Sequence, residues 1–141
     1  MTPAERELIA AYVSYLNECK FCYSSHAAAS RFLFQDQSGI VDLVLKDYQA
    51  APISDKLKAL LTIAGKVQED ARQVSEADVS LARIHGAVDR DIHDTVLIAA
   101  TFCMFNRYVD GLATLTPEGP EDYLPMGERM ATKGYVPPVI N

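Results

Sequence analysis

Two cysteines and a histidine near the start of the chain are spaced for thiol chemistry. Residues 17–26 read NECKFCYSSH, so Cys19 and Cys22 are three positions apart and His26 follows Cys22 by four. Cysteines three apart at the start of a helix can close a disulfide, and the unpaired N–H groups and positive dipole there stabilise a thiolate. An imidazole one turn beyond Cys22 can accept the thiol proton and generate a nucleophile at neutral pH.

A carboxylate within reach would hold the imidazole, and Glu7 is the candidate for this role. On one straight helix, Glu7 and His26 would lie about 28 Å apart. An antiparallel turn near residues 17–19 would bring the two side chains level. Glu7 also lies off the apolar stripe of its helix, on a face of small residues that includes Ala11 and Ser14, so a second helix can approach closely.

The same cysteines could instead bind zinc or pack as ordinary hydrophobic residues. Zinc would need a fourth ligand beside Cys19, Cys22 and His26, and a structural site usually takes a second ligand pair from a separate segment. The other histidines, His85 and His93, are interpreted as surface or helix-capping residues. We therefore favour redox use of the pair, and we expect neither a metal nor another cofactor.

The third cysteine and the polar residues after it are interpreted as structural. Cys103 stands in an apolar run, where cysteine commonly behaves as a small hydrophobic residue. Asn106, Arg107 and Asp110 follow this run, and we expect them on a solvated or subunit-facing surface. The chain has no GxSxG, HExxH, GxGxxG or GxxxxGK[ST] motif, so the cysteine pair is the strongest candidate for chemistry.

The elements that must position these residues are predicted to be helices. Thr2-Pro3-Ala4-Glu5 resembles a capping box with proline at the first helical position. It predicts a helix over about 3–16, which Asn17 would end by taking the left-handed conformation. A second helix over about 19–34 would carry the cysteine pair and His26 on one face. The short turn between the two helices favours an antiparallel hairpin.

The rest of the chain is predicted to be helical as well. We expect a third helix over residues 40–50, with Leu43, Val44 and Tyr48 as its apolar positions. A fourth helix should begin after a Ser54 cap and bury Leu57, Leu60, Leu61, Ala64 and Val67. A fifth should begin at Ser75 and end at Gly86, and a long sixth should cover about 90–112 after an Asp89 cap. One short helix is expected around 126–132. The sequence thus predicts one all-α domain over residues 1–141, with about six helices and an irregular Pro-rich C-terminal tail from about 114.

Composition and charge exclude several classes of protein. The 141 residues, 49% hydrophobic and 23% charged, are typical of a globular domain rather than a disordered, collagen-like or low-complexity chain. The formal net charge of −6 repels phosphate backbones and anionic lipids, so we expect neither nucleic acid nor a membrane as partner. The longest near-apolar run, residues 95–105, is about half of the ~20 residues that a membrane-spanning helix needs. We expect a soluble cytoplasmic protein.

The order Glu7, eleven residues, then CxxCxxxH resembles the AhpD-like alkylhydroperoxidases within the carboxymuconolactone decarboxylase family. ERELIAAYVSYLNECKFC around the motif and ATFCMFNRYVDGL at 100–112 are similar to the peroxidase-related branch of these proteins, and the resemblance covers most of residues 1–112. AhpD proper has a histidine between the cysteines as part of its proton relay, whereas Phe21 stands in this sequence. The resemblance therefore implies a shorter relay or a lower peroxidase rate.

The resemblance implies an all-helical domain that forms homo-oligomers and reduces hydroperoxides by cycling between dithiol and disulfide. Carried over residue by residue, Cys22 is the peroxidatic nucleophile, Cys19 the resolving thiol, His26 the proton acceptor and Glu7 its partner. An external dithiol reductant, lipoyl or thioredoxin-like, would reset the pair. Two alternatives stay open: a decarboxylase of the same family that acts on a lactone without redox cysteines, and a non-enzymatic oligomeric redox sensor.

Two apolar segments favour the association of several copies of this chain. Residues 95–105 are apolar almost all round the predicted helix, which a small single chain can barely cover. The end of the chain, residues 135–140, is apolar too and would need to pack on a neighbour. We expect a closed homo-oligomer, dimer to hexamer.

Overall fold

The computed structural model describes residues 1–135, and over these residues the chain forms helices joined by turns. Within this range seven α-helices follow one another: α1 (Pro3–Leu16), α2 (Lys20–Phe34), α3 (Ile40–Asp47), α4 (Asp55–Asp70), α5 (Glu76–Ile84), α6 (Asp89–Gly111) and α7 (Leu124–Lys133). Short 3-10 helices cover Gln35–Gln37, Ala71–Gln73 and Pro120–Tyr123. The all-α prediction is confirmed.

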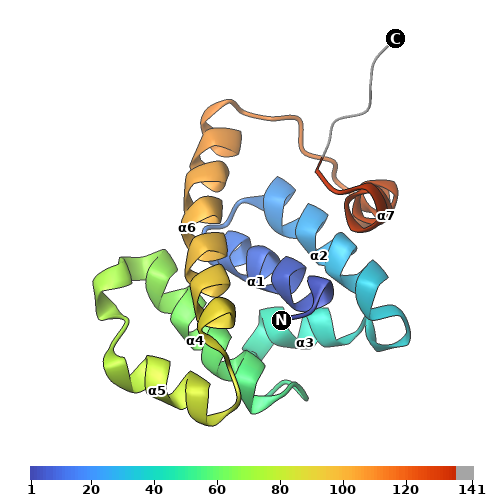
Figure 1. Cartoon of the computed structure of the whole chain (residues 1–141). Coiled ribbons are helices and arrows are strands. Elements are labelled where there is room, and N and C mark those ends of the chain that lie inside the picture. The colour runs from blue at the N-terminus through green and yellow to red at the C-terminus, as the bar shows by residue number, and fades with distance from the viewer. Residues whose placement is uncertain (136–141) are drawn as a thin grey trace.

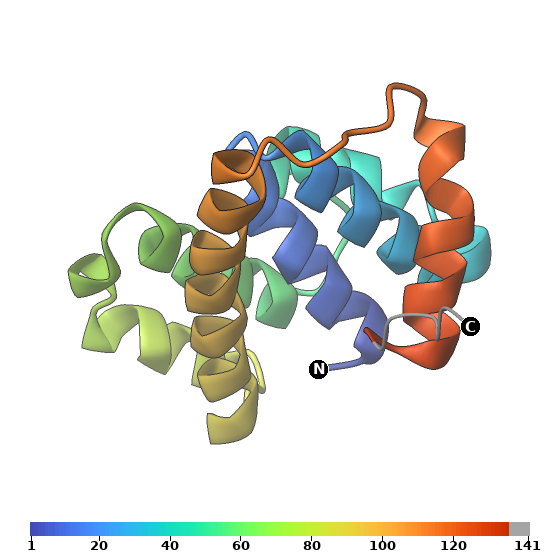
Figure 2. The same cartoon turned by 90° about the horizontal axis from the view of Figure 1, so that it is seen from above.

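An antiparallel hairpin of α1 and α2 occupies the centre of the molecule, with α6 on one side and α7 on the other (Figure 1 and Figure 2). The helix α1 begins as predicted, because the Thr2 hydroxyl accepts the Glu5 N–H at 3.2 Å and the Glu5 carboxylate accepts the Thr2 N–H at 2.7 Å. The turn differs from the prediction. Glu18, with φ of 59°, takes the left-handed conformation, whereas Asn17 stays right-handed at φ of −82°.

Cys19 caps the start of α2 and stands just outside its first helical residue. Its backbone is extended, and its N–H donates to the Ser14 carbonyl at 3.1 Å across the turn. The Cys19 carbonyl in turn accepts the Tyr23 N–H at 3.0 Å, the first bond of the helix. The turn therefore fixes the backbone of Cys19 between the two helices.

The core lies mainly between α1, α4 and α6. The predicted stripe of α4 is confirmed, since all five of its members are buried: Leu57, Leu60, Leu61, Ala64 and Val67. The prediction for the third helix is wrong at one position. Leu43 is 47% exposed, because α3 turns Val41 toward the core beside Val44, which is buried as predicted.

The longest helix, α6, is not capped as predicted. Val88 rather than Asp89 is the N-cap residue, and the Asp91 carboxylate reaches back to accept the Val88 N–H at 3.2 Å. The helix buries one face and exposes the other, where Leu97 and Met104 are 55% and 58% exposed. The chain therefore leaves the apolar run of residues 95–105 partly uncovered.

The last helix, α7, packs closely on α2. A Cβ atom at Gly127 would lie 2.6 Å from the carbonyl carbon of Ala28, so only glycine permits this approach. The predicted helix at 126–132 is confirmed as α7, and an irregular stretch does precede it. Residues 136–140 of the apolar end lie outside the described residues. Among the helices of residues 1–135, none has the length and apolar character needed to cross a membrane.

Candidate active site

The hairpin brings the predicted glutamate and histidine into direct contact. The Oε2 atom of Glu7 on α1 lies 2.7 Å from the Nδ1 atom of His26 on α2. Both side chains are largely buried, at 12% and 9% exposed. A carboxylate bound to Nδ1 favours the tautomer with its proton on that atom, which leaves Nε2 to accept a proton. The pair is therefore arranged as an oriented base.

Cys22 lines the same pocket as the Glu7 and His26 side chains. It stands one turn before His26 on α2 and is only 5% exposed. The pocket has a volume of about 730 Å³ and is bounded by α1, α2, α6 and the turn after α7. Its walls are mainly apolar, with Phe21, Leu97, Ile98, Phe102, Phe105 and Val109 among them. An apolar molecule that enters the pocket would meet the thiol and the base together.

Cys19 is fully buried at the start of α2, and its thiol is held differently from that of Cys22. Burial raises the pKa of the Cys19 thiol well above its ordinary value, and hydrogen bonds with Cys22 and the Asp110 carboxylate raise it further. Both cysteines are free thiols. The Cys19 thiol therefore stays protonated at neutral pH.

The structure adds two aromatic residues to the predicted site. The Tyr135 hydroxyl donates a hydrogen bond to Oε1 of Glu7. The Phe102 ring meets the His26 ring edge to face, with centroids 4.4 Å apart. Neither residue has a local signal in the sequence, because Phe102 belongs to an apolar run and Tyr135 follows the last helix. Only the folded chain brings them to the histidine.

Asn106 is buried, so the prediction that it lies on the surface is wrong. It is 1% exposed, donates to Ser14 Oγ at 3.0 Å and accepts from the Asn17 amide at 2.8 Å. Asn17 also accepts from Gln68 Nε2 at 2.9 Å. This network joins α1, α4 and α6 beside the turn that holds Cys19. It satisfies the buried amide, which explains how a polar residue can stand in the interior.

The remaining candidates are structural or exposed. Cys103 is half-buried against the core, and its sulfur lies 3.7 Å from Asn17 Nδ2. His85 ends α5, and His93 is exposed on α6. Arg107 and Asp110 are exposed as expected, although Asp110 reaches the Cys19 thiol. Across residues 1–135, no group of three or more histidine, cysteine or acidic side chains is arranged to hold a metal ion.

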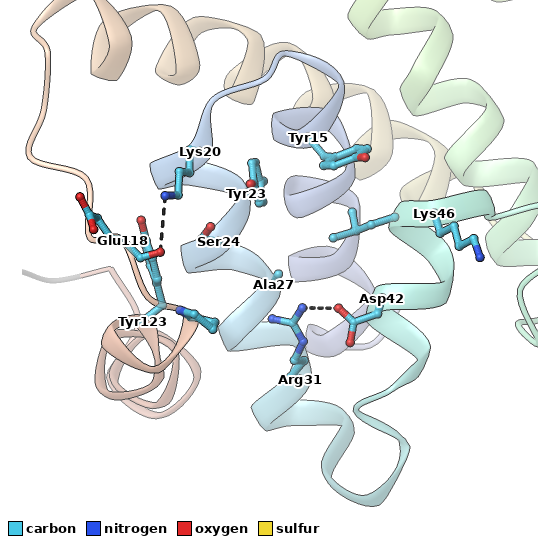
Figure 3. A pocket seen from close by; sticks show the side chains of 12 residues that line it. Tyr15, Lys20, Tyr23, Ser24, Ala27, Arg31, Asp42, Lys46, Glu118 and Tyr123 are labelled. Atoms are coloured by element: carbon cyan, nitrogen blue, oxygen red, sulfur yellow. Dashed lines mark hydrogen bonds and ion pairs between the residues drawn. The ribbon is translucent and has the colours of Figure 1, made fainter.

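A second pocket of about 500 Å³ lies along another face of α2 (Figure 3). Two of its cationic side chains are already engaged, since Arg31 pairs with Asp42 at 2.5 Å and Lys20 Nζ donates to the Glu118 carbonyl at 3.4 Å. Lys46 points away from these side chains. None of the four residues predicted for the site lines this pocket. The predicted site residues Glu7, Cys22 and His26 line the first pocket instead.

Solved structures of other proteins share this fold. An uncharacterized peroxidase-related protein from Silicibacter sp. TM1040 is 31% identical, with a TM-score of 0.78 over 88% of this chain and 63% of its own. The alkylhydroperoxidase AhpD core, an uncharacterized peroxidase-related protein from Ralstonia eutropha JMP134, has the same identity and TM-score over 90% of this chain and 65% of its own. The chain thus spans less than two thirds of the length of either protein. Comparison with protein-family models and with curated proteins finds no match.

Proposed function

Because the chain belongs to the AhpD-like, peroxidase-related family, we propose that it is a thiol-dependent peroxidase that reduces hydroperoxides through Cys19 and Cys22. One observation carries the proposal: Cys22, His26 and Glu7 line a single pocket, and the carboxylate is bound to Nδ1 of the imidazole. A thiol beside an oriented base is the arrangement that activates a cysteine nucleophile.

The first step is attack on the peroxide. His26 takes the Cys22 proton on Nε2, and the thiolate attacks one peroxide oxygen, so that an S–O bond forms and the O–O bond breaks. The leaving alkoxide takes the proton back from His26 and departs as an alcohol. Cys22 is then a sulfenic acid, and the peroxide has been reduced by two electrons.

The second step closes the disulfide. The Cys19 sulfur attacks the Cys22 sulfur, and the sulfenic oxygen leaves as water with the Cys19 proton. The sum of both steps is one hydroperoxide and two thiols giving one alcohol, one water and one disulfide. An external dithiol, lipoyl or thioredoxin-like, then reduces the disulfide. Because Cys22 is the only one of the pair that lines the pocket, we expect the reductant to attack there.

The pocket supports an organic hydroperoxide with an apolar group as substrate. Aromatic and aliphatic walls exclude water and bind alkyl or aryl chains, but they give hydrogen peroxide no advantage. Phe21, between the two cysteines, forms part of this wall and cannot carry a proton. Proton transfer therefore depends on His26.

The proposed chemistry and the surface of α6 also support a cellular compartment and an oligomeric state. A disulfide that must be reset by a dithiol works best in a reducing compartment, so we place the protein in the cytoplasm. The uncovered apolar face of α6 supports a homo-oligomer. A lactone decarboxylase would have no use for the thiol pair beside the base. A redox sensor could share the pair, and turnover distinguishes it from an enzyme.

The proposal is tested with cumene hydroperoxide and dithiothreitol. One equivalent of the peroxide should lower the thiol count of the wild type from three to one, and excess dithiothreitol should sustain consumption. Cys22→Ser should consume none, and Cys19→Ser should stop at a sulfenic acid that dimedone traps. Cys103→Ser is the matched control and should behave as the wild type. Single oxidation without turnover would indicate the sensor, and full activity of Cys22→Ser would overturn the proposal.

A further inference from the structure

We propose that Tyr135 is a positioning residue of this site, whose hydroxyl fixes the Glu7 carboxylate so that Glu7 holds His26 in the tautomer able to accept the Cys22 proton. The inference rests on the proposed function, because the tautomer matters only if His26 moves that proton. Tyr135 lines the pocket together with Glu7, Cys22 and His26.

The fold brings Tyr135 to the site from the far end of the described chain. The helix α7 is anchored on α2 through Gly127, against the Ala28 backbone, and through the buried Met130. Gly134 then takes a left-handed conformation with φ of 70°, which redirects the chain after α7. Glu7 and Tyr135 are 128 positions apart in the sequence, yet their side chains are joined by a hydrogen bond.

The two oxygens of Glu7 have separate partners. Oε2 binds Nδ1 of His26 at 2.7 Å, and Oε1 accepts the Tyr135 hydroxyl. With both oxygens engaged, the carboxylate cannot rotate without losing a charge-assisted hydrogen bond. The Nδ1 atom therefore remains the donor, and Nε2 remains the acceptor. Without the phenol, Glu7 could turn away, and the other tautomer of His26 would become accessible.

The Tyr135 ring also contacts the imidazole. The two ring centroids are 5.9 Å apart and inclined by 34°, and Phe102 contacts the same imidazole from a second direction. The residue as a whole is 62% exposed, so its removal should cost little stability. Tyr135→Phe keeps the ring contact and removes only the hydroxyl. It is therefore the variant that isolates the hydrogen bond.

The environment keeps the phenol in its donor form. Burial of its hydroxyl end, and then the hydrogen bond to the Glu7 carboxylate, raise the pKa of Tyr135 above the ordinary value of tyrosine. The hydroxyl therefore retains its proton throughout the neutral range. It serves as a fixed donor rather than a group that titrates during the reaction.

The test compares the wild type with Tyr135→Phe and with Tyr15→Phe, a matched control that removes the hydroxyl of an exposed tyrosine on α1 outside the pocket. The ¹⁵N chemical shifts of the two ring nitrogens report the tautomer of neutral His26 in the full chain. We expect one tautomer, protonated on Nδ1, in the wild type and the control, and a mixture in Tyr135→Phe. The rate of Cys22 oxidation by cumene hydroperoxide should fall about three- to tenfold in Tyr135→Phe alone, the effect of one lost hydrogen bond.

The two readouts separate the failure of this inference from the failure of the proposed function. An unchanged tautomer in Tyr135→Phe overturns the positioning role, and so does a mixture of tautomers with an unchanged oxidation rate. If wild-type Cys22 does not react with the peroxide, the proposed function fails. In that case the tautomer alone decides whether Tyr135 positions Glu7, because it is measured without substrate.

Discussion

The Nδ1 atom of His26 and the Oε2 atom of Glu7 lie 2.7 Å apart, although nineteen positions separate the two residues. The antiparallel hairpin of α1 and α2 accounts for this contact, because α2 runs back along α1 and brings its second turn level with Glu7. The helix start that presents Cys19 and the base that faces the pocket are thus parts of one supersecondary unit. The properties of the thiol pair depend on that unit staying intact.

Replacing His26 should slow the reduction of organic hydroperoxides without loss of helix. Proton transfer by a positioned base is typically worth roughly 10²–10⁴-fold, so we expect a loss of this size in His26→Ala. Glu7→Gln should cause a smaller loss, because the imidazole remains. Peroxide consumption and far-ultraviolet circular dichroism measure the two effects. His93→Ala, on an exposed histidine of α6, is the control. Equal rates in all four proteins would remove the relay from the mechanism.

The sequence predicts the hairpin because it follows from short-range patterns, whereas the role of Glu7 beside His26 also depends on the resemblance of its spacing to the AhpD-like proteins. The capping box sets the start of α1, and the spacing of Cys22 and His26 sets their common face. Such patterns do not predict the buried position of Asn106 or the contact of Tyr135 with Glu7. Asn106 is polar and follows an apolar run, so it resembles a surface residue until Ser14 and Asn17 are placed beside it. Partners that lie about 90 or more positions away leave no periodic signal.

Replacing Gly127 by alanine should loosen α7 from α2. The new Cβ would lie 2.6 Å from the Ala28 carbonyl carbon, so the helices would have to separate. We expect the free energy of unfolding to fall by roughly 1–3 kcal/mol, as overpacking typically costs. Urea denaturation measures the change. Gly39→Ala is the control, because nothing lies within 4 Å of its new methyl group. If both variants are equally stable, α7 does not depend on this close approach.

Acid should weaken the link between α4 and α5. Hydrogen bonds from Lys66 and then from Ser75 lower the pKa of Asp78 from 3.8 to about 2. Because the pKa in the folded state is the lower one, the stabilisation is complete above about pH 4 and is lost as the pH falls toward 2. The free energy of unfolding of Asp78→Asn should therefore lie below that of the wild type at neutral pH and approach it near pH 2.

Urea titrations at several pH values measure this difference for Asp78→Asn. Asp36→Asn, at an exposed position, is the control and should show no comparable dependence on pH. A difference between Asp78→Asn and the wild type that persists unchanged down to pH 2 would contradict the assignment.

The uncovered face of α6 should be buried by a second copy of the chain. Leu97, Met104 and Tyr108 are 55%, 58% and 64% exposed along one helix, which is unusual for apolar residues so close together. Two copies of the chain can cover this apolar face most simply by a symmetric contact, because each copy supplies the same patch. Light scattering should give a mass well above the 15.5 kDa of one chain.

A charge on that face should reduce the mass, because a buried interface cannot accept an unpaired carboxylate without a large cost in free energy. Met104→Glu tests this on α6. Leu115→Glu is the matched control, since Leu115 is 88% exposed in the loop after α6 and its side chain touches little. The control should keep the wild-type mass at micromolar concentration. A wild type that scatters as a single chain, or an equal mass for both variants, would contradict the assembly through α6.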